Sequence, residues 1–166
     1  MLAEVMRINH AGEYAAKYIY EGQLRFTREG EEKEKIAKMA EHEKEHLEYF
    51  EKKIIENQYR PTVLQPLVKK IAYGVGALSA LLGKDAAMLC THAVEDVISQ
   101  HYKEQEDILD NKDQELKQHI KKFREDEEEH HNIAQSYNFS SVIGGRIINK
   151  CIKFGCKLGI RLTKHL

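Results

Sequence analysis

The tetrads Glu43-Lys44-Glu45-His46 and Glu127-Glu128-Glu129-His130 each place a glutamate three residues before a histidine. Residues three apart share one face of an α-helix, so each tetrad presents a carboxylate and an imidazole in the same direction. A single tetrad of this kind on a charged helix is most often a solvated surface. Its repetition in one chain favours a shared function.

Each tetrad also follows another candidate carboxylate at a similar distance. Glu13 lies 30 residues before Glu43, and Glu95 lies 32 residues before Glu127, which indicates a weak internal duplication. Two helices with one glutamate each and two with Glu-x-x-His form the inward-facing ligand set of ferritin-like di-iron and di-manganese proteins. The spacing therefore predicts a buried two-metal site. Its six predicted ligands are Glu13, Glu43, His46, Glu95, Glu127 and His130.

This ligand set favours particular metals. Four carboxylates and two imidazoles suit ferrous or manganous ions better than zinc, which prefers a tetrahedral set richer in nitrogen or sulfur. Two divalent cations would also balance the four negative charges of the glutamates. Without metal, some of these carboxylates would have to take up protons, and the bundle should loosen.

The rest of the chain is typical of an all-α protein. Its 166 residues suit one domain, residues 1–166, and contain only two prolines, Pro61 and Pro66. No segment shows the alternation of polar and apolar residues that marks a half-buried strand. The apolar periodicity predicts a ferritin-like four-helix bundle with two additional amphipathic helices. The bundle helices are predicted at 3–28, 31–57, 85–110 and 114–136, and the additional helices at 66–83 and 141–165.

The two additional helices have unusual compositions. Residues 71–83 are thirteen consecutive uncharged residues, too few to cross a bilayer, which needs roughly 20. Residues 141–166 carry six basic and no acidic side chains, on a chain whose net charge is −1. Both segments are predicted to lie on an anionic membrane surface. The alternative is that they pack on their own domain with a solvated basic face. Nucleic acid is not an expected partner, because Phe154 is the only aromatic residue after residue 140.

The cysteines and the N-terminus suggest a cellular location. Cys90, Cys151 and Cys156 are an odd number without CXXC spacing, which favours a reducing compartment over a disulfide scaffold. The N-terminus resembles neither a secretory signal nor an Arg-rich presequence. We expect either a bacterial cytoplasmic protein or one from which a targeting segment has been removed.

Some other residues are candidates for roles beside the metal site. Tyr102 follows Glu95 by seven residues, two helical turns along the same face, so it could reach the mouth of the site; a packed core tyrosine is the alternative. His10, His42 and His92 each lie three or four residues from a predicted ligand. Each is either a partner of a ligand or a solvated or capping residue.

Several longer stretches resemble one family, the 5-demethoxyubiquinone hydroxylases, which are membrane-associated di-iron monooxygenases of ubiquinone biosynthesis. The resemblance covers essentially the whole chain, and HAGEY with both tetrads and RPTVL is its most specific part. The matching stretches are RINHAGEY at 7–14, EKEHL at 43–47, RPTVL at 60–64, ALLGK at 80–84, CT at 90–91, VE at 94–95, HY at 101–102, FR at 123–124, EEEHH at 127–131 and GCK at 155–157.

The resemblance implies that the six predicted ligands bind two iron ions, and that His101 and Tyr102 belong to a redox relay. It further implies O₂-dependent hydroxylation of a polyprenyl methoxy-benzoquinol, with NADH as a candidate reductant, although no GXGXXG fingerprint is present. A bacterial-type member would lie peripherally on the cytoplasmic face of the inner membrane. A member that has lost a transit peptide would lie on the matrix side of the mitochondrial inner membrane. The resemblance leaves open whether the chain forms a homo-oligomer or joins partners in a ubiquinone-biosynthesis complex.

Two other functions fit parts of the sequence. A ferritin-like storage protein or ferroxidase would use nearly the same ligands to oxidise iron itself, but would not need the apolar segment between the bundle halves. A non-catalytic helical protein would bind a membrane or a partner through its basic helix and carry its glutamates on the surface. The position of the glutamates, buried or exposed, separates the last function from the other two.

Overall fold

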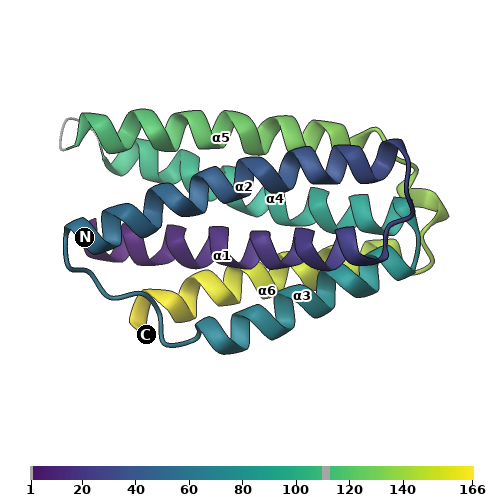
Figure 1. The fold of residues 1–166 in the computed structure, drawn as a ribbon, viewed down its shortest axis with the longest axis horizontal. Helices are drawn as coiled ribbons and strands as arrows, with labels where there is room; N and C mark the ends of the chain where they lie inside the picture. Colours follow the sequence, from purple (N-terminus) through teal and green to yellow (C-terminus); the bar gives the residue numbers. More distant parts are fainter. Residues whose placement is uncertain (1, 110–112) are drawn as a thin grey trace.

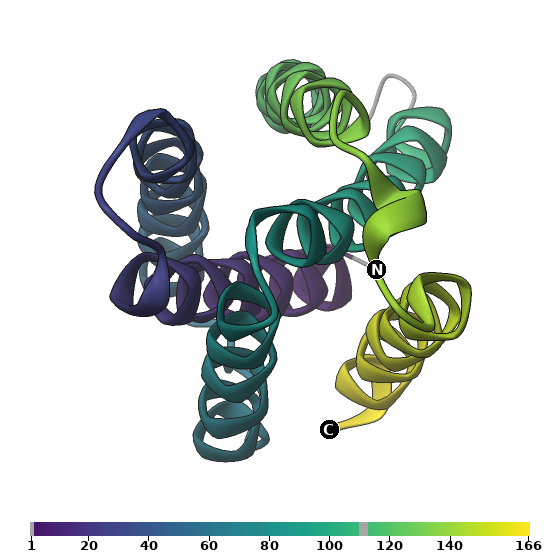
Figure 2. The same ribbon diagram turned by 90° about the vertical axis from the view of Figure 1, so that its right-hand side faces the viewer.

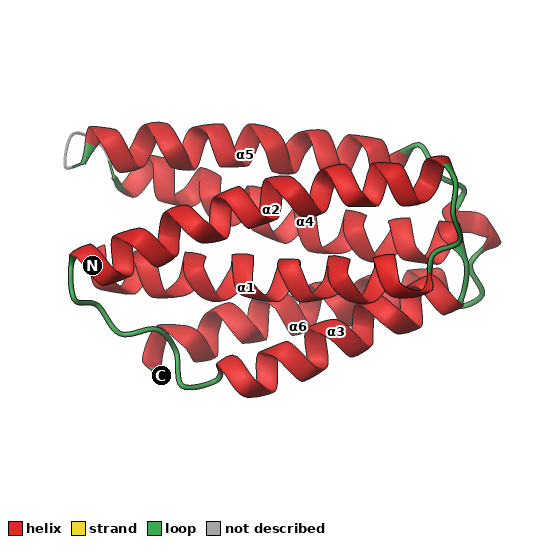
Figure 3. Ribbon diagram, in the orientation of Figure 1, coloured by secondary structure: helices red, strands yellow, loops and turns green. Residues whose placement is uncertain are grey.

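The computed structural model describes residues 2–109 and 113–166. These residues form α-helices and one 3-10 helix joined by short loops, with no strand in the described ranges (Figures 1 and 3). The all-α class and the helical bundle are thus confirmed. The elements are α1 (Leu2–Phe26), α2 (Glu31–Glu56), α3 (Gln65–Leu81), α4 (Lys84–Ile108), α5 (Gln114–Gln135), η1 (Phe139–Ser141) and α6 (Gly145–His165).

The helices form three layers when the molecule is viewed along its long axis (Figure 2). The helices α1 and α4 lie in the middle, α2 and α5 cover one side of them, and α3 and α6 cover the other. Neighbouring layers are in contact through α1 with α2 and α3, and through α4 with α5 and α6. The same order of layers therefore occurs twice along the chain, once in α1 to α3 and once in α4 to α6.

Two apolar clusters occupy the two ends of the four-helix bundle. One contains Phe50, Tyr102, Ile120 and Phe123, together with Val5 and Met6 near the start of α1. The other contains Tyr20, Ile36, Met39, Met88 and Ala134. On each of the four bundle helices, the predicted ligands lie between the residues that enter these two clusters. The clusters therefore close both ends of the space into which the predicted ligands point.

Most helix bounds differ from the predicted ones by one or two residues, but the start of the last helix was predicted wrongly. The chain forms the 3-10 turn η1 at Phe139–Ser141, and α6 begins only at Gly145. Gly144 adopts a left-handed conformation with φ of 70°, which interrupts any helix started at residue 141. The first helix ends at Phe26 rather than 28, where the Thr27 hydroxyl donates to the carbonyl of Gln23. The predicted end of the third bundle helix, residue 110, lies outside the described residues.

Glycines allow α1 and α3 to approach closely. A Cβ atom placed on Gly76 of α3 would lie 1.9 Å from the carbonyl oxygen of Ile19 in α1. A Cβ placed on Gly22 of α1 would lie 2.3 Å from the carbonyl oxygen of Tyr73 in α3. Such distances exclude any side chain at either position, so this interface depends on both glycines.

The segments predicted to lie on a membrane expose large apolar side chains. On α3 these include Leu67, Ile71, Leu78 and Leu81, which are 56 to 63% exposed, and on α6 they include Ile147 and Phe154, at 69 and 68%. Within the described ranges, no helix has both the length and the apolar character that crossing a bilayer requires.

Candidate metal centre

The structure brings all six predicted ligands together in the centre of the bundle. Glu13 comes from α1, Glu95 from α4, and the two tetrads from the middle of α2 and α5. Each of the six side chains is at most 2% exposed. Glutamates are rarely so buried unless they are paired or bind a cation, so the reading in which they form a solvated surface is wrong.

The two histidine rings each turn Nδ1 toward the carboxylates. Nδ1 of His46 lies 3.4 Å from Oε2 of Glu13 and 3.3 Å from Oε1 of Glu127. Nδ1 of His130 lies 3.2 Å from Oε1 of Glu43 and 3.5 Å from Oε2 of Glu127. The inward atoms of both rings therefore face the same small volume from opposite sides.

These side chains divide into two overlapping groups, each with ligand atoms within 4.8 Å of one another. The first group is Glu13, Glu43, His46 and Glu127, and the second is Glu43, Glu95, Glu127 and His130. Glu43 and Glu127 belong to both groups. A centre for two ions would thus have one lone glutamate and one histidine on each ion, with the two tetrad glutamates shared.

The inward atoms have no hydrogen-bond partner among the described residues. Buried polar atoms are nearly always hydrogen-bonded, so a group of unpartnered oxygens and nitrogens calls for a specific explanation. Cations between them would satisfy them all, and the mixture of carboxylate oxygens and imidazole nitrogens fits iron or manganese. The atoms are Oε2 of Glu13, both Oε atoms of Glu43, Nδ1 of His46, Oε2 of Glu95, both Oε atoms of Glu127 and Nδ1 of His130.

Two tyrosines connect the lone glutamates across the bundle. The hydroxyl of Tyr102 in α4 donates to Oε1 of Glu13 in α1, and the hydroxyl of Tyr20 in α1 donates to Oε1 of Glu95 in α4 at 2.5 Å. Burial and the nearby carboxylates raise the pKa of both phenols, so both stay protonated and act as donors. Each lone glutamate therefore has one oxygen held by a tyrosine and the other directed inward.

Tyr20 was not predicted from the sequence, although its position repeats that of Tyr102. Tyr20 follows Glu13 by seven residues, as Tyr102 follows Glu95. The internal duplication was therefore a sufficient signal to find it.

The outward nitrogens of the two histidines have different partners. Nε2 of His46 lies 3.0 Å from Oδ2 of Asp126, a residue that sequence reasoning missed. Nε2 of His130 lies 3.1 Å from Nδ1 of His42. His42 is thus the one of the three additional histidine candidates that contacts a predicted ligand. His10 instead lies 4.0 Å from Glu51, and His92 packs on the ring of His131.

The pKa shifts follow from the crowding of charges in a dry site. Burial first, and then the charges of neighbouring glutamates, raise the pKa of Glu43 and of Glu95 well above the ordinary value. Burial alone would lower the pKa of His46, but the carboxylates of Asp126, Glu127 and Glu13 outweigh it and raise that pKa. Burial lowers the pKa of His130. Without a cation, the site therefore holds protons on some carboxyls.

The structure separates the two residues of the predicted redox relay. Tyr102 contacts Glu13, whereas His101 contacts Nε2 of Gln105 through its own Nε2 at 2.6 Å. Gln105 in turn exchanges two hydrogen bonds with the side chain of Asn9, at 2.7 and 2.8 Å. His101 thus belongs to a polar network that links α4 to α1.

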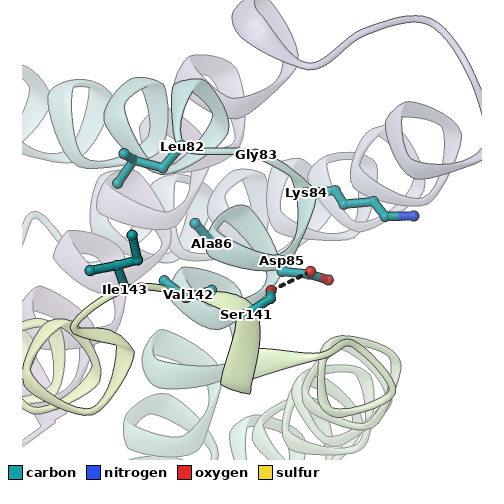
Figure 4. A pocket seen from close by; sticks show the side chains of 8 residues that line it. All are labelled: Leu82, Gly83, Lys84, Asp85, Ala86, Ser141, Val142 and Ile143. Carbon is teal, nitrogen blue, oxygen red and sulfur yellow. Dashed lines mark hydrogen bonds between the residues drawn. The ribbon is translucent and has the colours of Figure 1, made fainter.

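An apolar groove of about 520 Å³ runs along the middle layer on the side opposite the tetrads. Its walls come from α1, α3, α4 and α6, and small residues of α1, Gly12, Ala15 and Ala16, form part of its floor. A second pocket of about 360 Å³ lies where α3 meets α4 and η1, with a hydrogen bond from Ser141 to Asp85 at 2.6 Å (Figure 4). This second pocket contains none of the predicted site residues.

Residues 1–163 match the model of a protein family described as ubiquinone biosynthesis protein COQ7. The match includes all six predicted ligands as well as α3 and nearly all of α6. It therefore covers the centre and both helices outside the four-helix bundle.

Curated proteins from distant organisms are similar over nearly the whole chain. A protein of Dictyostelium discoideum named NADPH-dependent 3-demethoxyubiquinone 3-hydroxylase, mitochondrial, is 41% identical over all of this chain and 78% of its own length. The human protein of the same name is 39% identical over 98% of this chain and 76% of its own length. A Rhodospirillum rubrum protein named 3-demethoxyubiquinol 3-hydroxylase is 35% identical over all of this chain and 79% of its own length.

Proposed function

This chain belongs to the COQ7 family of ubiquinone biosynthesis proteins, and on that premise we propose that it is a di-iron monooxygenase that hydroxylates the ring of a demethoxyubiquinol. The observation that carries the proposal is the cluster of buried, unpartnered carboxylate and imidazole atoms at the centre of the bundle. The family match favours hydroxylation over the ferroxidase alternative.

In this proposal, the six side chains would hold two iron ions, which would supply O₂ activation when bound. Glu43 and Glu127 belong to both ligand groups and would serve both ions. One ion would also be held by Glu13 and His46, and the other by Glu95 and His130. Four carboxylates balance the charge of two ferrous ions, which supports a loaded site over an empty one.

The other residues orient the ligands and keep water out. Tyr20 and Tyr102 each fix one oxygen of a lone glutamate, so that the other oxygen points inward. The apolar clusters at both ends of the bundle exclude water from the site, which strengthens every electrostatic interaction inside it.

His101 and Tyr102 are proposed as the path for reducing equivalents. The contact of Tyr102 with Glu13 gives this path its inner end, and the network of His101 with Gln105 gives it an outer end. The names of the mitochondrial relatives specify NADPH, whereas the sequence resemblance suggested NADH. Both nucleotides should be tested as reductants.

The apolar groove is proposed to take the polyprenyl tail of the substrate. Its walls on α3 and α6 continue into the exposed apolar side chains of these helices. A tail that lies in lipid could thus enter the groove without crossing water. The small residues of α1 in the groove floor flank Glu13 in the sequence, which would bring the ring end of the substrate close to the centre.

We further propose that α3 and α6 lie on a membrane surface, the inner membrane of a bacterium or of a mitochondrion. The exposed apolar side chains on both helices and the six basic residues of the C-terminal segment support this proposal. The mitochondrial names of several relatives fit the second location.

Vesicle flotation tests this docking. The wild type is expected to float with vesicles that contain anionic lipid and less with neutral ones. Phe154→Glu on α6 should weaken binding roughly tenfold or more, because an aromatic anchor is lost and a charge would face lipid. Ile55→Glu is the matched control, since Ile55 is 76% exposed on α2, away from α3 and α6. Equal binding by both variants would contradict the docking face.

Removal of metal should make stability depend on pH. The raised pKa values of Glu43 and Glu95 mean that the folded, metal-free protein keeps protons that the unfolded chain releases near 4.5. Its free energy of unfolding should therefore fall as pH rises from 4.5 toward those raised pKa values. Above pH 6.5, the raised pKa of His46 also makes the free energy of unfolding fall as pH rises. The lowered pKa of His130 has the opposite effect on the free energy of unfolding, but only below pH 6.5.

Thermal unfolding at several pH values between 6.5 and 8 would measure this effect. The Tm of the metal-free protein should fall across this range, while the metal-loaded protein should change less. Equal slopes for the two forms would argue against buried, partly protonated carboxyls.

The function is tested by anaerobic reconstitution with ferrous iron, followed by O₂, a reduced nicotinamide nucleotide and a demethoxyubiquinol in detergent or vesicles. The expected product carries one additional ring hydroxyl, with its oxygen derived from ¹⁸O₂. Oxidation of added iron without hydroxylated product, together with elution as a large cage on gel filtration, would support the ferroxidase alternative instead.

A further inference from the structure

The two histidines of the proposed centre differ in what stands behind them. Both rings direct Nδ1 inward and Nε2 outward, so the inner geometry is the same on the two sides. Behind His46 the outward nitrogen meets the carboxylate of Asp126 at 3.0 Å, whereas behind His130 it meets the imidazole of His42 at 3.1 Å. The two sides of the centre therefore have the same types of predicted ligand but different residues behind their histidines.

Asp126 and His42 occupy equivalent positions in the two halves of the chain. His42 immediately precedes Glu43, and Asp126 immediately precedes Glu127. Each contacts the histidine of the other tetrad. The tyrosine pair follows the same twofold pattern without any difference in residue type. The outer partners of the histidines are thus where the two sides differ in chemistry.

Metal binding at Nδ1 would set the direction of both outer contacts. An imidazole whose Nδ1 binds a cation carries its proton on Nε2, so in the loaded centre His46 would donate to the Asp126 carboxylate and His130 would donate to the Nδ1 of His42. The His42 and His130 rings are nearly parallel, with centroids 5.2 Å apart and planes inclined by 22°, and the two facing nitrogens lie 3.1 Å apart. An anionic acceptor makes the donating ring a stronger metal ligand than a neutral acceptor does.

We propose that Asp126 and His42 make the two metal sites unequal, so that the ion beside His46 binds more tightly and is loaded first. This inference rests on the proposed metal centre. In it, Asp126 and His42 are positioning residues, since they act on the ions only through the two histidines. The site with Glu13 and His46 is filled at low metal concentration, and the site with Glu95 and His130 follows.

Titration of the metal-free protein with Co²⁺, followed by its visible absorption, tests the proposal. The wild type should show two binding steps with separate dissociation constants. His46→Ala should remove the tighter step and His130→Ala the weaker one, which assigns each step to its side. Asp126→Asn should weaken the tighter step by about tenfold or more and leave the weaker step nearly unchanged, while Asp126→Glu should restore most of the affinity.

Position 42 provides the converse experiment. His42→Glu gives both histidines a carboxylate, so the weaker step should tighten and the two dissociation constants should converge. His42→Gln keeps a neutral partner and should leave the tighter step unchanged. Far-UV circular dichroism would reveal whether Asp126→Asn folds. If it does not, Asp126→Glu and His42→Glu still test the proposal.

The outcomes separate this inference from the proposed centre. If the wild type binds no Co²⁺, the metal centre itself is wrong. If it binds two ions with equal affinity, or if Asp126→Asn weakens mainly the step that His130→Ala removes, the centre stands and the inequality of its two sites is refuted.

Discussion

Replacing Glu43 by glutamine is expected to abolish the binding of both metal ions and all hydroxylation, and yet to make the metal-free protein more stable. Glu43 is fully buried, belongs to both ligand groups and has no hydrogen-bond partner among the described residues for either oxygen. Its loss removes a ligand from each ion at once. Activity should fall to the background that protein without added iron gives.

The gain in stability follows from the same burial. In the metal-free protein, Glu43 raises the cost of folding because its carboxyl must lose its hydration beside the charges of Glu127, Glu13 and Glu95. A neutral amide of the same shape avoids most of this cost. We expect a gain of about 1 kcal/mol in the free energy of unfolding at neutral pH, or roughly 2–4 °C in Tm.

Metal analysis and thermal unfolding, each with a control, would measure both effects. Glu45→Gln is the matched control, because Glu45 lies within the same tetrad but is exposed. It should retain two ions and full activity with no gain in stability. A Glu43→Gln protein that still held two ions would contradict the shared role of this residue.

The second large effect is expected where α1 and α3 meet. Gly76→Ala places a methyl group 1.9 Å from the carbonyl oxygen of Ile19 and within 2.9 Å of two further backbone atoms of that residue. Backbone cannot yield as a flexible side chain can, so α3 must move away from α1. We expect a loss of about 3 kcal/mol in the free energy of unfolding, measured by urea denaturation of the metal-loaded protein.

The same displacement should impair function, since α3 forms one wall of the apolar groove. Turnover of a substrate with a long polyprenyl tail should fall more than turnover of one with a short tail. Gly74→Ala is the control. Gly74 also lies in α3, but apart from its chain neighbours and the adjacent backbone of its own helix, no described atom lies within 4 Å of a Cβ at that position. A neutral or slightly stabilising effect is expected there, because alanine is the better helix former. Equal losses in the two variants would point to helix propensity rather than to the close contact.

The positions of the helices and the clustering of the six predicted ligands could be anticipated because both depend on local spacing. An apolar residue every three or four positions defines the face of a helix that is buried, and Glu-x-x-His on that face fixes a carboxylate and an imidazole in the same direction. Two such helices with two lone glutamates leave few ways to satisfy the buried charge. The sequence alone was therefore sufficient to group these six residues.

The residues around the ligands could not be predicted in the same way. The contacts of Asp126 with His46 and of His42 with His130 join different helices, so they depend on the rotation and register of α2 against α5. Local spacing gives no information about either quantity. The same holds for the separation of His101 from Tyr102, which are adjacent in sequence but face different neighbours. The start of the last helix was misplaced because the left-handed conformation of Gly144 was not anticipated.

The presence of two similar halves in one polypeptide has a consequence for how such a centre can evolve. A symmetric dimer of a single three-helix unit would have to carry the same residue behind both histidines, either a carboxylate twice or an imidazole twice. In this chain the two halves have their own stretches of sequence. A mutation at position 42 therefore leaves position 126 unchanged. One side of the centre can thus acquire a new partner while the other keeps its original one.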